Sequence, residues 1–120
     1  IVTANIGEPN VIYFGDKKQS YQRKMEFDSS LDKSYAISLG DLDNDGDMDI
    51  IIANVQKPNV VFINSGDGNN WERVQLANEN FNTYDITVFD LNGDGKLDII
   101  ESNSDEINRY YFNRFTPKFP

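Results

Sequence analysis

The apolar residues of this chain gather in short runs, which are separated by polar and glycine-containing turns. Residues 11–14 and 60–63 are continuous apolar runs of strand length, rich in β-branched and aromatic side chains. Residues 21–27 and 71–76 alternate polar and apolar side chains, as a half-buried strand does. No stretch of useful length has helical periodicity. The pattern therefore predicts a chain of short strands.

The strand pattern repeats along the chain with a period of 49 residues. The tripeptide Pro-Asn-Val at residues 9–11 recurs at residues 58–60, and Tyr35 recurs as Tyr84, which indicates a packing position between repeats. The units span residues 1–49 and 50–98, and residues 99–120 form a partial third copy. Four strands in a unit of this length are typical of a β-propeller blade. We therefore expect an all-β fold of four-stranded antiparallel β-propeller blades, about 2.4 of them, in one domain over residues 1–120.

Charge and composition narrow the possible partners. The chain has 20 acidic and 11 basic residues and a net charge of −9. This balance argues against nucleic acid and against anionic membrane surfaces, which both attract basic side chains. Cysteine and histidine are absent, so thiol chemistry and the commonest general base are absent too. No apolar run approaches the length of a membrane span, so we expect no membrane insertion.

Two acidic loops at the same place in the repeat carry the candidate chemistry. Residues 41–49 place carboxylates at alternating positions around a glycine, and residues 90–98 repeat the arrangement. Many oxygen ligands and a sharp turn suit a hard cation, so we predict one Ca²⁺ in each loop, two sites in all. Side-chain oxygens are expected from Asp41, Asp43, Asp45 and Asp49 and from Asp90, Asn92, Asp94 and Asp98, with backbone carbonyls from Asp47 and Lys96.

The loop spacing, the aliphatic strand that follows it, and the Pro-Asn-Val tripeptide before an aromatic strand together resemble the FG-GAP/VCBS repeat. This family includes the calcium-binding blades of integrin α-chain propellers, and the chain is more similar to its bacterial type. The resemblance implies that residues 35–40 and 84–89 are innermost strands around a central channel. It also implies that residues 50–54 and 99–103 are second strands, with calcium on one rim.

An EF-hand is the competing interpretation of the second loop. Residues 90–101 also fit the EF-hand pattern, with Gly95 at the sixth position and Glu101 at the twelfth. The flanking residues 85–89 have strand character, and the first loop has Ile52 at the position of the glutamate. We therefore expect strands around both loops and treat Glu101 as a strand residue that gives at most an outer contact to the ion.

The main functional hypothesis is a non-catalytic binding, adhesion or scaffold module of a secreted, extracellular or cell-surface protein, with a periplasmic location as a variant. Calcium would be structural, since millimolar calcium outside cells suits such loops. The alternative is the propeller portion of a secreted hydrolase or lyase whose active site lies in sequence outside these residues. The expected partners are other propeller blades, from a longer chain or from further copies, and a protein or carbohydrate ligand is compatible with the module.

The phase of the repeat predicts an open array. The first unit starts one residue after the position of a loop's last aspartate, so its blade lacks an innermost strand, and the third lacks an outer strand. We expect either a piece of a longer chain or a ring of several copies. Trp71 is expected to cover an outer strand, and Phe115 and Phe119 to pack against a blade. The aromatic residues expected to be buried partly by outside protein are Tyr13, Phe14, Phe62, Tyr110, Tyr111 and Phe112.

Overall fold

The computed structural model describes residues 1–114, so Phe115 and Phe119 lie outside the described residues. Over that range the chain forms ten β-strands and no helix. The strands are β1 (Val2–Thr3), β2 (Asn10–Tyr13), β3 (Lys24–Asp28), β4 (Lys33–Gly40), β5 (Asp49–Val55), β6 (Val60–Asn64), β7 (Trp71–Gln75), β8 (Thr83–Phe89), β9 (Asp98–Asn103) and β10 (Arg109–Tyr111). Among residues 1–114, no helix is long and apolar enough to cross a membrane.

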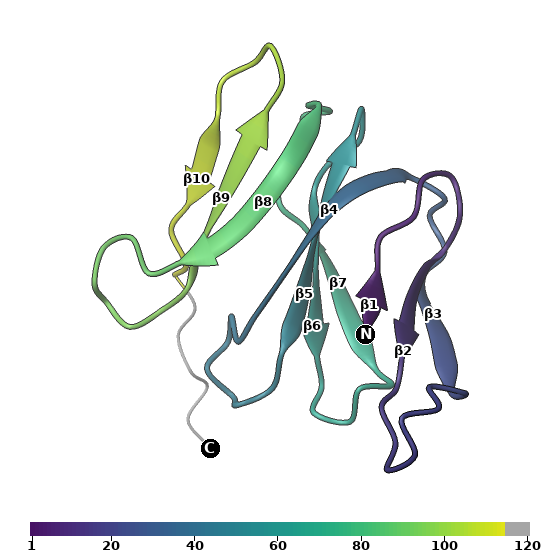
Figure 1. The fold of residues 1–120 in the computed structure, drawn as a ribbon. Helices are drawn as coiled ribbons and strands as arrows, with labels where there is room; N and C mark the ends of the chain where they lie inside the picture. Colours follow the sequence, from purple (N-terminus) through teal and green to yellow (C-terminus); the bar gives the residue numbers. More distant parts are fainter. Residues whose placement is uncertain (115–120) are drawn as a thin grey trace.

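The strands form three antiparallel sheets that lie side by side as successive blades (Figure 1). The middle sheet has the full order β4-β5-β6-β7, whereas the first has β1-β2-β3 and the third has β10-β9-β8. The expected all-β fold with propeller-like blades is confirmed. The first blade lacks a strand on its inner side, the third lacks one on its outer side within the described residues, and the sheets do not close into a ring.

The core lies between the sheets and is divided by β5. All seven residues of β5 are buried. Ile50 and Ile52 pack into the cluster shared with the first blade, while Ile51 and Ala53 pack into the cluster shared with the third. A strand covered on both faces needs apolar side chains on both, which is why β5 is a continuous apolar run rather than an alternating one. Each fully buried isoleucine contributes about 2 to 3 kcal/mol.

Each innermost strand carries a bulge that places a tyrosine toward its neighbour. The register shifts between Ser34 and Ala36 in β4 and between Thr83 and Asp85 in β8. The residue between them is a tyrosine in both blades, and the Tyr35 and Tyr84 rings meet edge to face with centroids 5.0 Å apart. The predicted packing of these tyrosines between blades is confirmed, and the bulge explains why the position recurs.

A relay of polar side chains crosses each junction between blades. Nδ2 of Asn10 donates to the Ser34 hydroxyl at 3.0 Å, and that hydroxyl donates to Oδ1 of Asn54 at 2.9 Å. At the next junction, Asn59, Thr83 and Asn103 repeat the relay with distances of 2.9 and 2.6 Å. All members of the relay except the half-buried Asn103 are buried, so their polar groups must satisfy one another rather than water. It holds each innermost strand against the preceding blade.

Two details differ from the sequence predictions. The strand predicted over residues 21–27 begins only at Lys24, because Gln19 and Tyr21 adopt positive φ angles of 54° and 49°. Phe62 was expected to need outside protein for burial, but it is 2% exposed, because Phe27 meets its ring edge to face at 5.1 Å. Trp71 covers the same cluster, as predicted.

The side chain of Glu101 serves the junction between blades rather than an acidic loop. It is 1% exposed, and its Oε2 accepts a hydrogen bond from Nδ2 of Asn59 at 2.7 Å. Glu101 lies three positions after Asp98 on β9, roughly 10 Å along the strand. Glu101 is a strand residue, as predicted, and the flanking strands β8 and β9 exclude an EF-hand.

Candidate metal centre

The first acidic loop connects the innermost strand of the middle blade to its second strand. β4 ends at Gly40 and β5 begins at Asp49, so the loop lies at one end of the hairpin. Asn44 and Gly46 adopt positive φ angles of 58° and 93°, which turn the backbone sharply around the carboxylates. Asparagine and glycine are the residues that tolerate this region best, which explains their positions in the loop.

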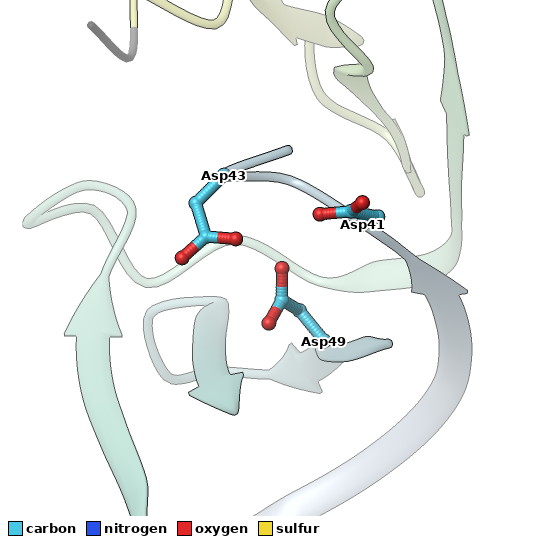
Figure 2. Close-up of side chains that lie close together, drawn as sticks. All are labelled: Asp41, Asp43 and Asp49. Atoms are coloured by element: carbon cyan, nitrogen blue, oxygen red, sulfur yellow. The ribbon is translucent and has the colours of Figure 1, made fainter. Parts of the chain in front are cut away.

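Three of the predicted ligands converge in this loop. Carboxylate oxygens of Asp41, Asp43 and Asp49 all lie within 4.8 Å of one another. Figure 2 shows that the three side chains turn toward one shared space between the start of the loop and the start of β5. Asp41 directly follows the end of β4, and Asp49 is the first residue of β5 and pairs with Gly40. The hairpin itself therefore brings these two carboxylates together.

Two carboxyl groups of this cluster have raised pKa values. Burial, together with the nearby charges of Asp45 and Asp49, raises the pKa of Asp43 to about 6. Burial also raises the pKa of Asp49, although backbone N–H groups of Asn64 and Leu42 oppose the shift. The buried Oδ1 of Asp43 meets no hydrogen-bond donor among residues 1–114. A buried carboxylate oxygen without a donor is what a hard cation satisfies, so these residues fit Ca²⁺.

Backbone hydrogen bonds within the first loop involve three of its predicted ligands. Asp41 accepts backbone hydrogen bonds from Asp45 at 3.1 Å and from Gly46 at 2.9 Å, which closes the turn. The exposed Asp45 accepts one from the N–H of Asp47 at 2.9 Å. Asp45 therefore lies beside the cluster of three, and Asp47 is tied to Asp45 through its backbone. An Asp41 oxygen that shapes the turn keeps a second lone pair for a cation.

The last aspartate of each loop has a role that the sequence analysis missed. Asp49 is fully buried, and it accepts hydrogen bonds from the N–H of Leu42 at 2.7 Å and of Asn64 at 2.9 Å. Asp98 repeats this with Leu91 and Asn113, both at 2.8 Å. Each carboxylate thus ties the loop to the far end of the next strand. The recurrence of asparagine at 64 and 113 was the available signal.

The second loop has the same backbone design but a weaker concentration of charge. Asp90 accepts backbone hydrogen bonds from Gly93 at 2.8 Å, Asp94 at 3.1 Å and Gly95 at 2.8 Å. Asn92 accepts one from Asp94, and Asp94 accepts one from Lys96. Within the described residues no three carboxylates gather here as they do in the first loop. Asn92 stands where the first loop has Asp43, which explains the difference.

A cavity of about 380 Å³ lies beside the first loop, between the middle and third blades. Asp43 lies in its wall, and apolar side chains of β6, β7, β9 and β10 form most of the remainder. At the preceding junction the corresponding space is filled by Trp71 and Phe27, whose rings are 6.4 Å apart. The residue that matches Trp71 in the repeat lies outside the described residues.

The chain was compared with known protein families. A family model described as FG-GAP-like repeat matches residues 41–101, which begin at the first predicted ligand of the first loop and include all of the second loop. Searches of curated proteins and of solved structures found no match.

Proposed function

This chain belongs to the FG-GAP-like repeat family, and from that premise we propose that it is a calcium-stabilised, non-catalytic binding or scaffold module of an extracellular or cell-surface protein. The observation that carries the proposal is the convergence of carboxylate oxygens of Asp41, Asp43 and Asp49, which lie within 4.8 Å of one another. The proposal concerns a structural ion rather than a reactive one.

The donor set defines which residues would hold the ions. In the first loop these are Asp41, Asp43, Asp45 and Asp49, with the carbonyl of Asp47, and in the second Asp90, Asn92, Asp94 and Asp98, with the carbonyl of Lys96. Oxygen ligands in a flexible loop favour Ca²⁺ over Mg²⁺, which demands stricter geometry and retains more water. When bound, the ion neutralises the loop charge. The chain's own residues then keep the hairpin between two strands in a fixed register.

A non-catalytic role follows from the available side chains. The chain has no histidine and no cysteine, and its raised carboxyl pKa values belong to the acidic loop. Perturbed carboxyl groups can indicate catalysis, but here metal binding explains the same perturbation. An extracellular setting supports the proposal because acidic loops of moderate affinity are filled by the millimolar calcium found there.

Calorimetric titration of the metal-stripped chain with CaCl₂ tests the proposal. We expect two binding events, and Asp43→Asn should weaken one of them by at least tenfold because it removes a charged ligand. Asp67→Asn is the matched control, since Asp67 also accepts turn hydrogen bonds from Asn69 and Asn70 but lies outside both loops. An absence of heat, or equal effects of the two substitutions, would contradict the proposal.

Saturating calcium should also raise the melting temperature, because a ligand that binds only the folded state stabilises it, by about 2.7 kcal/mol per site at a hundred times Kd. The rise should disappear with excess chelator. Equal melting temperatures in both conditions would sink the structural role of the ion even if binding occurred.

A further inference from the structure

One peptide bond of the second acidic loop joins an asparagine to a glycine. Gly93 follows Asn92, and no other asparagine of the sequence is followed by glycine. Both residues are exposed, and Gly93 adopts a positive φ angle of 75°. Because glycine has no Cβ, the approach to its backbone nitrogen is open. The nitrogen of Gly93 can therefore reach the side-chain amide of the asparagine before it.

Hydrogen bonds of the loop favour an attack of this nitrogen on Cγ of Asn92. The N–H of Gly93 donates to Oδ1 of Asp90 at 2.8 Å, so a carboxylate stands next to the proton that the attack must release. The N–H of Asp94 donates to Oδ1 of Asn92 at 3.1 Å, so a donor faces the oxygen on which negative charge develops. Nδ2 of Asn92 donates no hydrogen bond within residues 1–114, which leaves the departing group unrestrained.

The first loop differs at the same two positions of the repeat. Asp43 occupies the position of Asn92, so the first loop already has a carboxylate where the second has an amide. Asn44 occupies the position of Gly93. It is exposed and has a positive φ angle of 58°, but an aspartate follows it rather than a glycine. The first loop therefore shares the backbone turn and lacks the reactive pair.

We propose that the Asn92–Gly93 bond is a site of spontaneous deamidation in the calcium-free chain. The Gly93 nitrogen forms a bond to Cγ of Asn92, and the Cγ–Nδ2 bond breaks. The proton of the Gly93 N–H passes to Nδ2, which leaves as ammonia, and a five-membered cyclic imide remains. One water molecule then opens either C–N bond of the imide. Opening at Cγ leaves an aspartyl residue, and opening at the main-chain carbonyl leaves an isoaspartyl residue.

The two products should affect the second loop in opposite ways. The aspartyl product gives this loop the residue type of Asp43, and the added ligand charge should strengthen calcium binding. The isoaspartyl product lengthens the main chain by one carbon atom, which changes the spacing of the ligands that follow and should weaken binding.

Bound calcium should suppress the reaction. With Oδ1 of Asn92 and the carboxylate of Asp90 held as ligands, Cγ cannot turn toward the Gly93 nitrogen, and the carboxylate no longer faces its proton alone. This protection rests on the proposed calcium site, whereas the deamidation itself does not.

Incubation of the chain at neutral pH tests the proposal, with one sample in excess chelator and one in calcium. Peptide mapping by mass spectrometry measures the replacement of amide by acid, and enzymatic methylation of isoaspartate measures that product. We expect acid at position 92 in chelator. Calcium at a hundred times Kd should slow the reaction roughly a hundredfold, because only the calcium-free fraction reacts. Asn44 and Asn69 are exposed internal controls and should remain amides.

The Gly93→Asn chain tests whether the glycine controls the reaction. This variant carries the residue that the first loop has at the same position, and asparagine tolerates a positive φ angle. It should slow deamidation at position 92 roughly tenfold or more, because a Cβ crowds the attacking nitrogen. Gly7→Asn is the matched control and should leave this rate unchanged, since Gly7 has a φ angle of 70° and, like Gly93, open space around an added Cβ.

Three results would overturn the inference. The first is no acid at position 92 in chelator over a time that converts a synthetic peptide of residues 88–96. The second is an equal rate in the two glycine variants, and the third is an unchanged or faster rate when calorimetry shows the second loop to be filled with calcium. Deamidation at position 92 in a chain that binds no calcium would support this inference and refute only the proposed function.

Discussion

At the scale of single residues, asparagines at one repeat position meet opposite environments. Asn10 and Asn59 are 2% and 6% exposed and join the relay of the next blade. Asn108 occupies the same position in the third blade, where its Oδ1 accepts the N–H of Asn103 at 2.8 Å, but its side chain is exposed. The chain thus contains both the covered and the uncovered form of one contact.

This pair gives a prediction about stability. Asn59→Ala should lower the free energy of unfolding by about 2 to 3 kcal/mol, because it removes the amide that donates to Oε2 of the buried Glu101 and to the Thr83 hydroxyl. Asn108→Ala should change it by less than about 0.5 kcal/mol, as exposed substitutions usually do. Urea unfolding at fixed calcium measures both values. Similar losses from the two variants would show that the relay does not matter for stability.

Asp43 gives a prediction about pH in the metal-stripped chain. Its folded-state pKa is raised from 3.8 to about 6, so the folded chain holds this proton when the unfolded chain has already released it. The contribution of Asp43 to the free energy of unfolding should therefore be most favourable below about pH 4 and should decrease as the pH rises to about 6. Asp49 shifts in the same direction.

Thermal unfolding in excess chelator across this pH window checks the sign. Asp43→Asn should flatten the dependence, whereas Asp67→Asn should not, because the pKa of Asp67 is lowered by its turn hydrogen bonds and contributes with the opposite sign. A melting temperature that rises from pH 4 to 6 in the wild-type chain but not in Asp43→Asn would contradict the assignment.

At the scale of elements, the two acidic loops share a backbone design but differ in charge. The first loop carries five carboxylates and the second three, because Asn92 and Lys96 replace Asp43 and Asp47. Since ligand charge is one determinant of calcium affinity, the first loop should bind Ca²⁺ more tightly. Asp43→Asn should bring the two constants closer, and Asn92→Asp should strengthen the weaker one.

Calorimetry of these two variants tests the ranking, with assignment by amide shifts of Gly46 and Gly95. Tighter binding in the second loop of the wild-type chain would mean that loop rigidity, rather than charge, determines the affinity. Asp67→Asn again serves as the control for a general change in net charge.

The order of elements was predictable from the sequence because strands and acidic turns repeat at one interval. Residues 60–63 are an apolar run because both faces of β6 are covered, and the sequence shows this directly. The start of β3 at Lys24 was not predictable, because the alternation of polar and apolar residues extends back to Tyr21. The positive φ angle of Tyr21 prevents strand pairing there. The hydrogen bond of Glu101 was not predictable either, because its partner Asn59 lies 42 residues away in another blade.

The site was predictable to a similar extent. The spacing of Asp41, Asp43 and Asp49 indicated one oxygen-rich cluster, and the structure brings these three together. The spacing could not reveal that Asp49 and Asp98 also hold the ends of distant strands, because hydrogen bonds to Asn64 and Asn113 depend on the hairpin that follows. The types of ligand can be recognised in the local sequence, whereas the hydrogen bonds that support the ligands depend on tertiary packing.

At the scale of the whole molecule, three blades form a flat array with extents of 43 × 40 × 21 Å. Each blade presents one face to its predecessor and another to its successor. The successor face of the middle blade is covered, since Val61 and Ile63 pack into the cluster shared with the third blade. The third blade places Tyr110 and Phe112 at the matching positions, where they are 61% and 46% exposed.

The uncovered face should make this chain bind hydrophobic dye in its native state. The rings of Tyr110 and Phe112 meet with centroids 5.0 Å apart, so they form one apolar patch rather than two scattered side chains. Tyr110→Ser with Phe112→Ser should abolish most dye fluorescence and reduce light scattering at high concentration.

The control is Tyr21→Ser with Leu31→Ser, which removes two exposed apolar residues from the first blade. If the control lowers the dye signal equally, the patch is not special, and if neither variant changes it, the face does not act as a binding surface. If only Tyr110→Ser with Phe112→Ser lowers the dye fluorescence, the third blade has an apolar surface suited to packing against another blade. Its exposed side chains occupy the positions at which the middle blade has buried side chains that pack against its neighbour.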